Sequence, residues 1–303
     1  MSDSRHQLLD SVFVVAILAL GCGLLIYFAN AFAGDLVDLD PEGPITFLED
    51  KLVAVSVALM LIVLVPVFSL TVWFVWHYRA SNLGSSYAPH WSSHRIELLI
   101  WLVPTLIVAV LGVLTWTYTH TLNPYRPLSS ARAALRVQVV ALDWKWLFIY
   151  PDQGIATINQ LVIPAQRPIH FDLTSDSVMN SFFIPQLGGQ VYAMAGMRTE
   201  LHLLANHPGK FFGQNTQYSG RGFADQNFEV IAKSQDDFDS WVRQVRKQPA
   251  PLNWTAFQQV AKPSAKAPIQ IFHGIEPGLF ERIIAQYRSD PKHAGRIKLA
   301  DEP

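Results

Sequence analysis

The chain has 303 residues, a formal net charge of −1 and a single cysteine, and 16% of its residues are charged while 50% are hydrophobic. The near-zero charge argues against a nucleic-acid-binding protein, which would carry a basic surface. Because the apolar residues gather toward the N-terminus, the composition predicts a membrane part joined to a soluble part.

The first apolar run, Ser11 to Ala33, predicts that residues 1–33 are either a signal peptide or an extra transmembrane anchor. Ala31-Phe32-Ala33 has the small-x-small pattern of a cleavage site. The apolar core, however, exceeds the roughly 7–15 residues usual for a signal peptide, and it is long enough for a retained anchor. Both interpretations therefore stay open.

Two further uncharged apolar runs predict a transmembrane hairpin within residues 34–122, with helices at about 52–76 and 98–119. Each run reaches the roughly 20 residues that a helix needs to cross a bilayer. Pro66 and Pro104 lie inside these runs and predict kinks rather than breaks, because neighbouring helices can satisfy the freed carbonyls.

The loops on the two sides of the hairpin differ in charge. The connection between the two helices contains His77, Arg79, His90, His94 and Arg95, whereas residues 34–50 carry six acidic side chains and no Lys or Arg. By the positive-inside tendency the connection is cytoplasmic. The large domain after His120 is therefore expected outside, in a bacterial periplasm.

Glu97 opens the second predicted helix at its cytoplasmic end. A carboxylate at a membrane edge is rare unless it is paired or functional. The alternative is that an acid in the first turn of a helix stabilises the helix dipole by roughly 0.3–1 kcal/mol. Sequence alone does not separate these two interpretations.

Residues 130–234 predict a β-sandwich. From Ala134 onward apolar residues alternate with polar ones, as at Leu135, Val137 and Val139, and turn residues divide the short strands. The aromatic segment 143–150 contains Trp144 and Trp146. We interpret its aromatic residues as packing the sandwich or contacting a partner protein.

The last part of the chain, residues 235–290, predicts a helical extension. Ser234 with Asp237 three residues later resembles a capping box, and an apolar stripe follows. A loop from Gln248 to Pro268 surrounds a short helix at 254–260, and a further helix is expected to begin near Pro277.

Two segments together carry a resemblance to a known family. The first is Ser177-Val178-Met179-Asn180-Ser181-Phe182-Phe183-Ile184-Pro185, and the second runs from Gly213 to Gln226. Their layout resembles subunit II of the haem-copper respiratory oxidases, in the quinol-oxidising, cytochrome bo-type branch. The resemblance covers nearly everything from Asp40 to Tyr287. It implies an α+β membrane protein in which an N-terminal transmembrane helical hairpin precedes a cupredoxin-like β-sandwich and a short helical C-terminal extension.

In the cytochrome c-oxidising branch, the two segments hold a dinuclear copper centre on two His, two Cys, a Glu and a Met. The resemblance places these ligands at residues whose side chains are poor copper ligands: Asn180, Asn215, Gln217, Ser219, Phe223 and Gln226. A mixed-valence copper pair needs thiolates and imidazoles, which none of these side chains provides. We therefore expect this chain to bind no metal or other cofactor.

The resemblance also bears on Cys22 and Glu97. Members of the family often begin at a lipid-modified cysteine, but Cys22 is followed by apolar residues, so lipidation is the least favoured fate of the first run, after cleavage and retention. A buried structural cysteine is the alternative. In relatives a glutamate at the position of Glu97 lies near the mouth of a proton-uptake pathway of subunit I, which favours the functional interpretation of this residue.

The resulting hypothesis is a non-cofactor-bearing subunit II of a proton-pumping ubiquinol oxidase in the bacterial inner membrane. The resemblance implies that the haems and one copper belong to subunit I, and that subunit I, smaller subunits and ubiquinol are the partners. The alternatives are a membrane-tethered cupredoxin-like binding or assembly protein and, less favoured, a cytochrome c oxidase subunit II.

Overall fold

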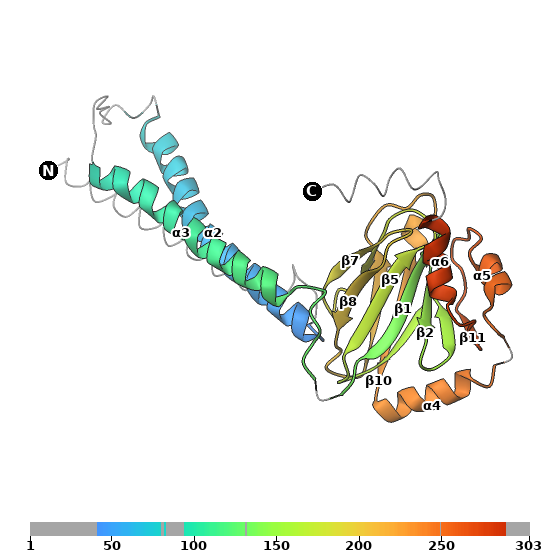
Figure 1. Cartoon of the computed structure of the whole chain (residues 1–303). Coiled ribbons are helices and arrows are strands. Elements are labelled where there is room, and N and C mark those ends of the chain that lie inside the picture. The colour runs from blue at the N-terminus through green and yellow to red at the C-terminus, as the bar shows by residue number, and fades with distance from the viewer. Residues whose placement is uncertain (1–40, 80–81, 83–93, 131, 249, 289–303) are drawn as a thin grey trace. The chain divides into compact units, whose positions relative to one another are not determined.

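The computed structural model describes residues 41–79, 82, 94–130, 132–248 and 250–288 (Figure 1). The predicted signal peptide or anchor at 1–33, with Cys22, lies outside the described residues, as does most of the predicted connection between the two membrane helices. Contacts divide the chain into two units. Among the described residues, 41–49 belong with those from 122 to 288, and those from 50 to 121 form the other unit.

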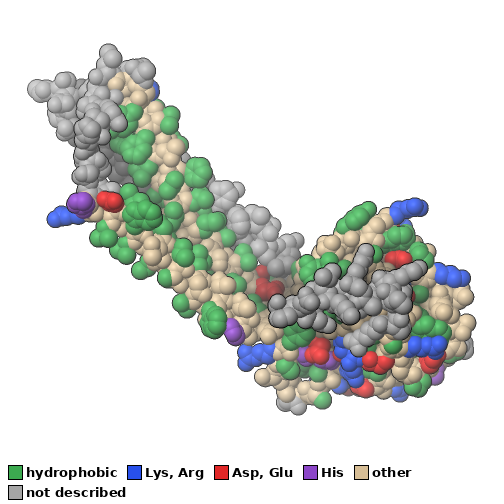
Figure 2. Space-filling view, turned by 45° about the horizontal axis from the view of Figure 1, so that its top comes forward, with side chains coloured by type: hydrophobic (Ala, Val, Ile, Leu, Met, Phe, Trp, Pro, Cys, Tyr) green, Lys and Arg blue, Asp and Glu red, His purple; other side chains and the backbone are tan. Residues whose placement is uncertain are grey.

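Two long helices, α2 (Pro44–His77) and α3 (His94–Thr121), are apolar and long enough to cross a membrane. Hydrophobic side chains cover their visible surface (Figure 2). Both helices continue through their internal prolines, Pro66 and Pro104. The exposed apolar surface indicates that lipid or partner helices surround these segments.

The start of α2 is fastened to the β-sandwich unit. Glu42 exchanges backbone hydrogen bonds with two loops: its N–H donates to Gln186 O at 3.0 Å and its carbonyl accepts from Asn206 N–H at 2.8 Å. Gly188 has a φ of +90°, and a Cβ there would lie 2.8 Å from Ile45 and 2.9 Å from the Thr46 nitrogen. Only glycine fits this close approach without strain.

Two sheets form the sandwich. The six-stranded sheet has the order β11-β3-β2-β1-β5-β8 and the five-stranded sheet the order β4-β10-β9-β6-β7. The strands are β1 (Leu135–Leu142), β2 (Lys145–Tyr150), β3 (Ile155–Ile158), β4 (Gln160–Pro164), β5 (Ile169–Ser175), β6 (Asn180–Phe183), β7 (Gln190–Ala193), β8 (Thr199–Leu203), β9 (Gly209–Asn215), β10 (Asn227–Lys233) and β11 (Gln270–His273).

The space between the sheets is filled by aromatic and branched side chains. Trp146 is fully buried, and its ring lies 5.4 Å from Phe182 and 5.6 Å from Phe228. Phe182 stacks on Phe228 with centroids 5.2 Å apart. These contacts place Trp146 in the core of the sandwich, and aromatic pairs of this kind contribute beyond the area that they bury.

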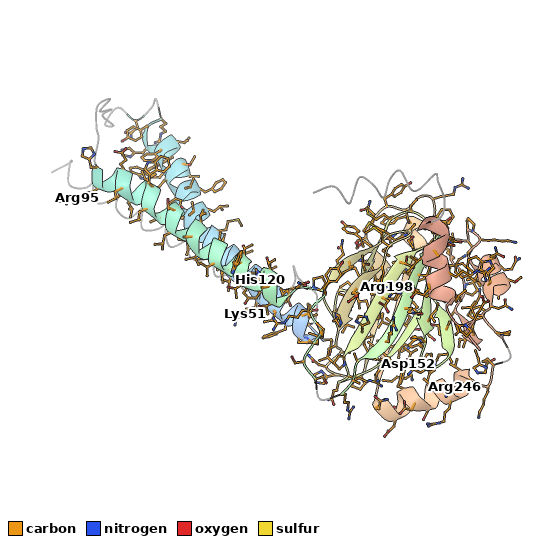
Figure 3. The ribbon with its side chains drawn as sticks, in the orientation of Figure 1. Lys51, Arg95, His120, Asp152, Arg198 and Arg246 are labelled. Atoms are coloured by element: carbon orange, nitrogen blue, oxygen red, sulfur yellow. The ribbon has the colours of Figure 1, made fainter. Side chains whose placement is uncertain are left out.

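Four helices complete the described fold: the short 3-10 helix η1 (Phe223–Asp225), α4 (Gln235–Val245), α5 (Trp254–Val260) and α6 (Leu279–Arg288). The Ser234 hydroxyl accepts from Asp237 N–H at 3.2 Å, which confirms the predicted cap of α4. Arg246, at the end of α4, donates through Nε to Gln153 O at 2.9 Å and so ties the helix to the β2–β3 turn (Figure 3).

The C-terminal extension builds a second core on the outer face of the six-stranded sheet. Phe257 from α5 and Phe280 and Ile283 from α6 pack there against outward-pointing residues such as Val140 and Leu147. Strand β2 and the second half of β1 are consequently buried on both faces. The extension also contributes β11, which pairs antiparallel with β3 where the sequence predicted a loop and helices.

The fold class predicted from the sequence is confirmed: two apolar helices precede a cupredoxin-like sandwich, and a short helical segment ends the described chain.

Candidate functional site

The two segments that carry the family resemblance meet at one end of the five-stranded sheet. Asn180 is the first residue of β6 and Asn215 the last residue of β9, and these strands pair with Phe182 opposite Asn215. The loop after β9 returns through η1 to Gln226, which directly precedes β10. The pairing of β6 with β9 therefore brings together residues that lie 35 or more positions apart.

The three amide side chains of Asn180, Asn215 and Gln226 form a closed buried network. Asn215 Nδ2 donates to Asn180 Oδ1 and to Gln226 Oε1, each at 2.9 Å, and Gln226 Nε2 donates to Asn180 Oδ1 at 2.9 Å. Their residues are 0%, 5% and 1% exposed. We call these three residues, with Ser219, the amide network.

The remaining donors and acceptors of the amide network are used by its surroundings. Asn215 Oδ1 accepts from the backbone N–H groups of Ser181 at 2.8 Å and Gln217 at 3.0 Å. Asn180 Nδ2 donates to Val178 O at 2.7 Å, and the Ser219 hydroxyl donates to Gln226 Oε1 at 2.7 Å. A buried polar network that is satisfied in this way rigidifies the segment that contains it.

The other two predicted positions lie beside the amide network but do not join it. Gln217 is half-buried and contributes its backbone N–H, not its side chain. Phe223, in η1, is half-buried, and its ring lies 5.7 Å from that of Tyr218. The structure thus joins four of the six predicted positions through side-chain hydrogen bonds.

The donor set of the amide network does not fit a dinuclear copper centre. Its side chains are neutral amides and a hydroxyl, and the amide oxygens already accept hydrogen bonds from protein N–H or O–H groups. Copper pairs require thiolate bridges and imidazole nitrogens. As it is built, the network can position a loop, but it has no group that exchanges electrons.

Trp144 covers the glycine-rich loop next to the amide network, a contact that sequence reasoning missed. Its indole Nε1 donates to Ser219 O at 3.1 Å, and a Cβ on Gly222 would lie 2.4 Å from the indole ring. Trp144 has a φ of 65° in the turn between β1 and β2. The glycines of Ser219-Gly220-Arg221-Gly222 were the available signal, because they mark a close backbone approach.

Glu97 lies in the first turn of α3, far along the chain from the amide network. Its carboxylate Oε2 is 3.7 Å from His94 Nδ1, and the Glu97 side chain is 67% exposed in this single chain. This position suits an acid that complements the helix dipole. It also leaves the carboxylate accessible to solvent or to another subunit.

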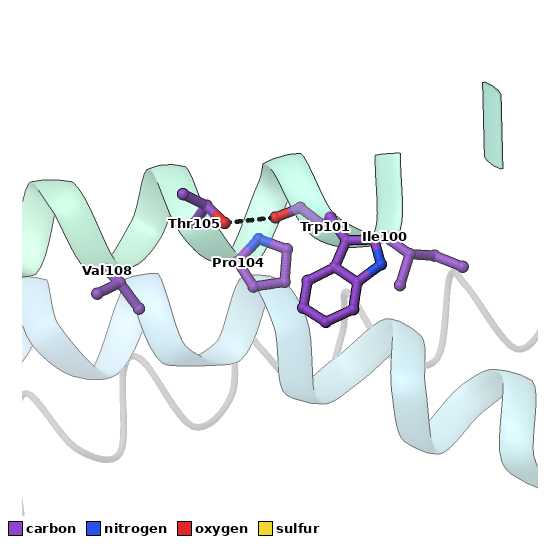
Figure 4. A pocket seen from close by; sticks show the side chains of 5 residues that line it. All are labelled: Ile100, Trp101, Pro104, Thr105 and Val108. Atoms are coloured by element: carbon purple, nitrogen blue, oxygen red, sulfur yellow. Dashed lines mark hydrogen bonds between the residues drawn. The ribbon is translucent and has the colours of Figure 1, made fainter. Parts of the chain in front are cut away.

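One side of α3 carries a shallow apolar hollow of about 370 Å³, shown in Figure 4. It is lined by Ile100, Trp101, Pro104, Thr105 and Val108. The Thr105 hydroxyl donates to Trp101 O at 2.7 Å, so the polar atom of the threonine is satisfied within the helix. The hollow offers an apolar surface to lipid or to a neighbouring helix.

Comparison with known proteins identifies the family. Residues 152–231 match the model of the cytochrome c oxidase subunit II periplasmic domain, and residues 246–290 match the aromatic-rich motif of these oxidases. The chain is 48% identical over 269 residues to cytochrome bo(3) ubiquinol oxidase subunit 2 of Pseudomonas putida, covering 86% of each chain. It belongs to the ubiquinol oxidase subunit 2 family.

Other members of the family are similarly close. Ubiquinol oxidase subunit 2 of Acetobacter aceti is 50% identical over 254 residues, covering 83% of this chain and 82% of the relative. Cytochrome bo(3) ubiquinol oxidase subunit 2 of Buchnera aphidicola is 41% identical over 273 residues, covering 89% and 94%. The resemblance seen in the sequence is confirmed, and this subunit II is part of an oxidoreductase complex in which it associates with other oxidase subunits.

Proposed function

We propose that this subunit II serves a terminal quinol oxidase without carrying a redox centre of its own. In the overall reaction two ubiquinol molecules are oxidised to ubiquinone while one O₂ is reduced to two water molecules, and the complex pumps protons. The observation that carries the proposal is the buried amide network, which lies at the positions where the resemblance places the ligands of the copper-bearing branch. Electrons then reach subunit I directly from membrane-dissolved quinol.

The role of the chain is structural, as an anchor and a cap for subunit I. Subunit I holds the haems and one copper, and smaller subunits complete the complex. The exposed apolar side chains of α2 and α3 support this role. Trp101, Val108 and Trp116, for example, are 71%, 67% and 72% exposed in the single chain, which favours packing against lipid and partner helices.

The complex lies in the bacterial inner membrane, with the sandwich in the periplasm. The orientation rests on the acidic loop before α2 and the His- and Arg-containing connection before α3. The matched periplasmic-domain model supports the same placement of the sandwich.

Glu97 is proposed to help load the proton-uptake pathway of subunit I. Its carboxylate is exposed in the first turn of α3, whereas the sandwich follows the last turn of this helix. This position at the predicted cytoplasmic end supports the role. His94 lies one helical turn away, with Nδ1 3.7 Å from the Glu97 carboxylate.

Oxygen consumption by the complex purified through a tag on this chain tests the proposal. Ubiquinol is expected to drive cyanide-sensitive oxygen consumption, and reduced cytochrome c is not. Faster consumption with cytochrome c than with ubiquinol would contradict the proposal. A preparation that contains no haem and consumes no oxygen would favour a tethered binding or assembly protein instead.

A further inference from the structure

A second polar cluster lies on the outer face of the six-stranded sheet, on β5 and β8. The antiparallel register sets His170 opposite His202 and Asp172 opposite Glu200. Alternate residues of a strand share one face, so all four side chains point away from the core that Phe171 and Leu201 fill. The ligand atoms of His170, Asp172 and Glu200 lie within 4.8 Å of one another.

A chain of hydrogen bonds fixes which nitrogen of His170 carries a proton. His202 Nδ1 is 3.0 Å from Pro124 O, and because a carbonyl only accepts, this nitrogen carries the hydrogen. In the neutral His202 ring Nε2 is then an acceptor, 2.7 Å from His170 Nδ1, which must donate to it. In neutral His170 the remaining nitrogen, Nε2, therefore has a bare lone pair.

That lone pair faces carboxylate oxygen. His170 Nε2 is 3.5 Å from Asp172 Oδ1, and Asp172 is buried. Two acceptors that face each other repel unless a cation lies between them, and that cation is either the proton of a charged His170 or a metal ion. The distance is longer than the roughly 2.9 Å typical of a hydrogen bond. It is close to the ~3.3 Å that separates two ligands of a tetrahedral ion with bonds of about 2.0–2.1 Å.

We propose that His170, Asp172 and Glu200 bind a divalent metal ion of the zinc class, with His202 as a positioning residue. One imidazole nitrogen and two carboxylate oxygens suit Zn²⁺, and the histidine that binds such an ion commonly donates its other N–H to an acceptor that orients the ring. Here His202 is that acceptor. Through its bond to Pro124, an ion at His170 also orders the segment between α3 and β1.

Two arginines limit the affinity of this site. Arg136 Nε donates to Asp172 Oδ2 at 2.7 Å, which leaves Oδ1 for the ion. Arg198 Nε lies 3.7 Å from Asp172 Oδ1 and competes with the ion electrostatically, while its guanidinium also pairs with Glu281 of α6. Arg198 is labelled in Figure 3, beside α6. Removing its charge should therefore strengthen metal binding.

Zinc titration of the full chain, purified without a histidine tag in detergent, tests the proposal by calorimetry at pH 7.5. The wild type is expected to bind one more zinc equivalent than His170→Ala. Glu200→Gln should weaken this equivalent at least tenfold, and His202→Gln about tenfold, in line with the loss of an orienting contact. Arg198→Gln should tighten it severalfold.

A matched control is His207→Ala, because exposed His207 also faces a carboxylate, with Nδ1 3.3 Å from Glu42 Oε2. It should leave the zinc equivalent unchanged. The proposal is overturned if His170→Ala and the wild type bind zinc identically, or if Arg198→Gln does not tighten binding. Circular dichroism monitors the fold of each variant. If His170→Ala does not fold, the zinc affinities of the Arg198→Gln and Glu200→Gln variants still decide whether the site exists.

Discussion

At the scale of single residues, the amide network stands at positions where the family resemblance places the metal ligands of the copper-bearing branch, and hydrogen bonds join its side chains. The family resemblance pointed to Asn180, Asn215, Ser219 and Gln226, and the structure joins these four. The pairing itself could not be predicted, because it depends on the β6–β9 register, which the spacing of a motif does not encode.

Asn215 is the centre of the amide network, so its loss should destabilise the sandwich. Asn215→Ala deprives the N–H groups of Ser181 and Gln217 of their acceptor. An unpaired buried group costs roughly 1–3 kcal/mol, and the half-buried N–H of Gln217 costs less than the buried one of Ser181, so we expect a loss of about 2–4 kcal/mol in the free energy of unfolding. Denaturant unfolding followed by circular dichroism measures it.

Gln217→Ala is the matched control, since it also truncates an amide but spares the backbone N–H that the network uses. We expect its effect to stay below about 1 kcal/mol. Equal destabilisation by the two substitutions would show that the network does not hold the loop.

At the scale of elements, hydrophobic periodicity predicted most helices, and tertiary contacts explain the exceptions. The uncharged apolar run predicted that the first membrane helix begins at about residue 52, but α2 begins at Pro44. Its first turns are held by the sandwich loop around Gly188. Proline at the first helical position is a known start signal, and it was the available cue.

Strand β11 shows a second limit of periodicity. Gln270-Ile271-Phe272-His273 is too short to display alternation, and the preceding residues are typical of a loop. The segment becomes a strand because it pairs with β3 and buries Phe272 against the second core. Its conformation depends on a partner more than 100 residues away, which local sequence does not reveal.

The docking of α6 should depend on pH. The Tyr287 hydroxyl donates to Asp176 O at 2.7 Å and to Asp176 Oδ1 at 3.1 Å. Burial raises the pKa of Asp176 to about 6, from an ordinary value near 4. Between about pH 4 and 6 the folded chain holds a proton that the unfolded chain has lost, so stability falls as pH rises through this window and levels off above it.

Asp176→Asn should abolish this decrease in the free energy of unfolding with rising pH. For one proton the slope is at most about 1.4 kcal/mol per pH unit. Denaturant unfolding at several pH values between 4 and 7 measures it. Asp152→Asn is the control, because Asp152 is exposed in the β2–β3 turn (Figure 3) and should leave the slope intact. A slope of the same size in Asp176→Asn would assign the pH dependence to another group.

For α3, the proposed role of Glu97 predicts a graded effect on turnover. Glu97→Gln should slow oxygen consumption with ubiquinol, and Glu97→Asp should slow it less, because it retains a carboxylate with a shorter reach. Assembly should hardly change, since the substitution to Gln removes a helix-dipole contribution of at most about 1 kcal/mol. Haem content and subunit composition are measured alongside. Full activity of an assembled Glu97→Gln complex would leave Glu97 as a helix-terminal residue only.

At the scale of the whole molecule, the sequence predicted both the fold class and the family, because the helices and the motif layout are local features. The contacts between residues 41–49 and the sandwich join residues far apart in the sequence. Because of these contacts, the beginning of α2 belongs to the unit that contains the sandwich. Helix α2 therefore begins in the unit that contains the sandwich and continues into the other unit.

The central claim is that this subunit II carries no copper, and the copper content of the assembled oxidase tests it most directly. The complex is purified through a tag on this chain, and copper is measured relative to protein by inductively coupled plasma mass spectrometry, with haem content confirming assembly. The account predicts one copper per complex, held by subunit I. Three coppers per complex would mean that a dinuclear centre is bound despite the amide network, and would contradict the account.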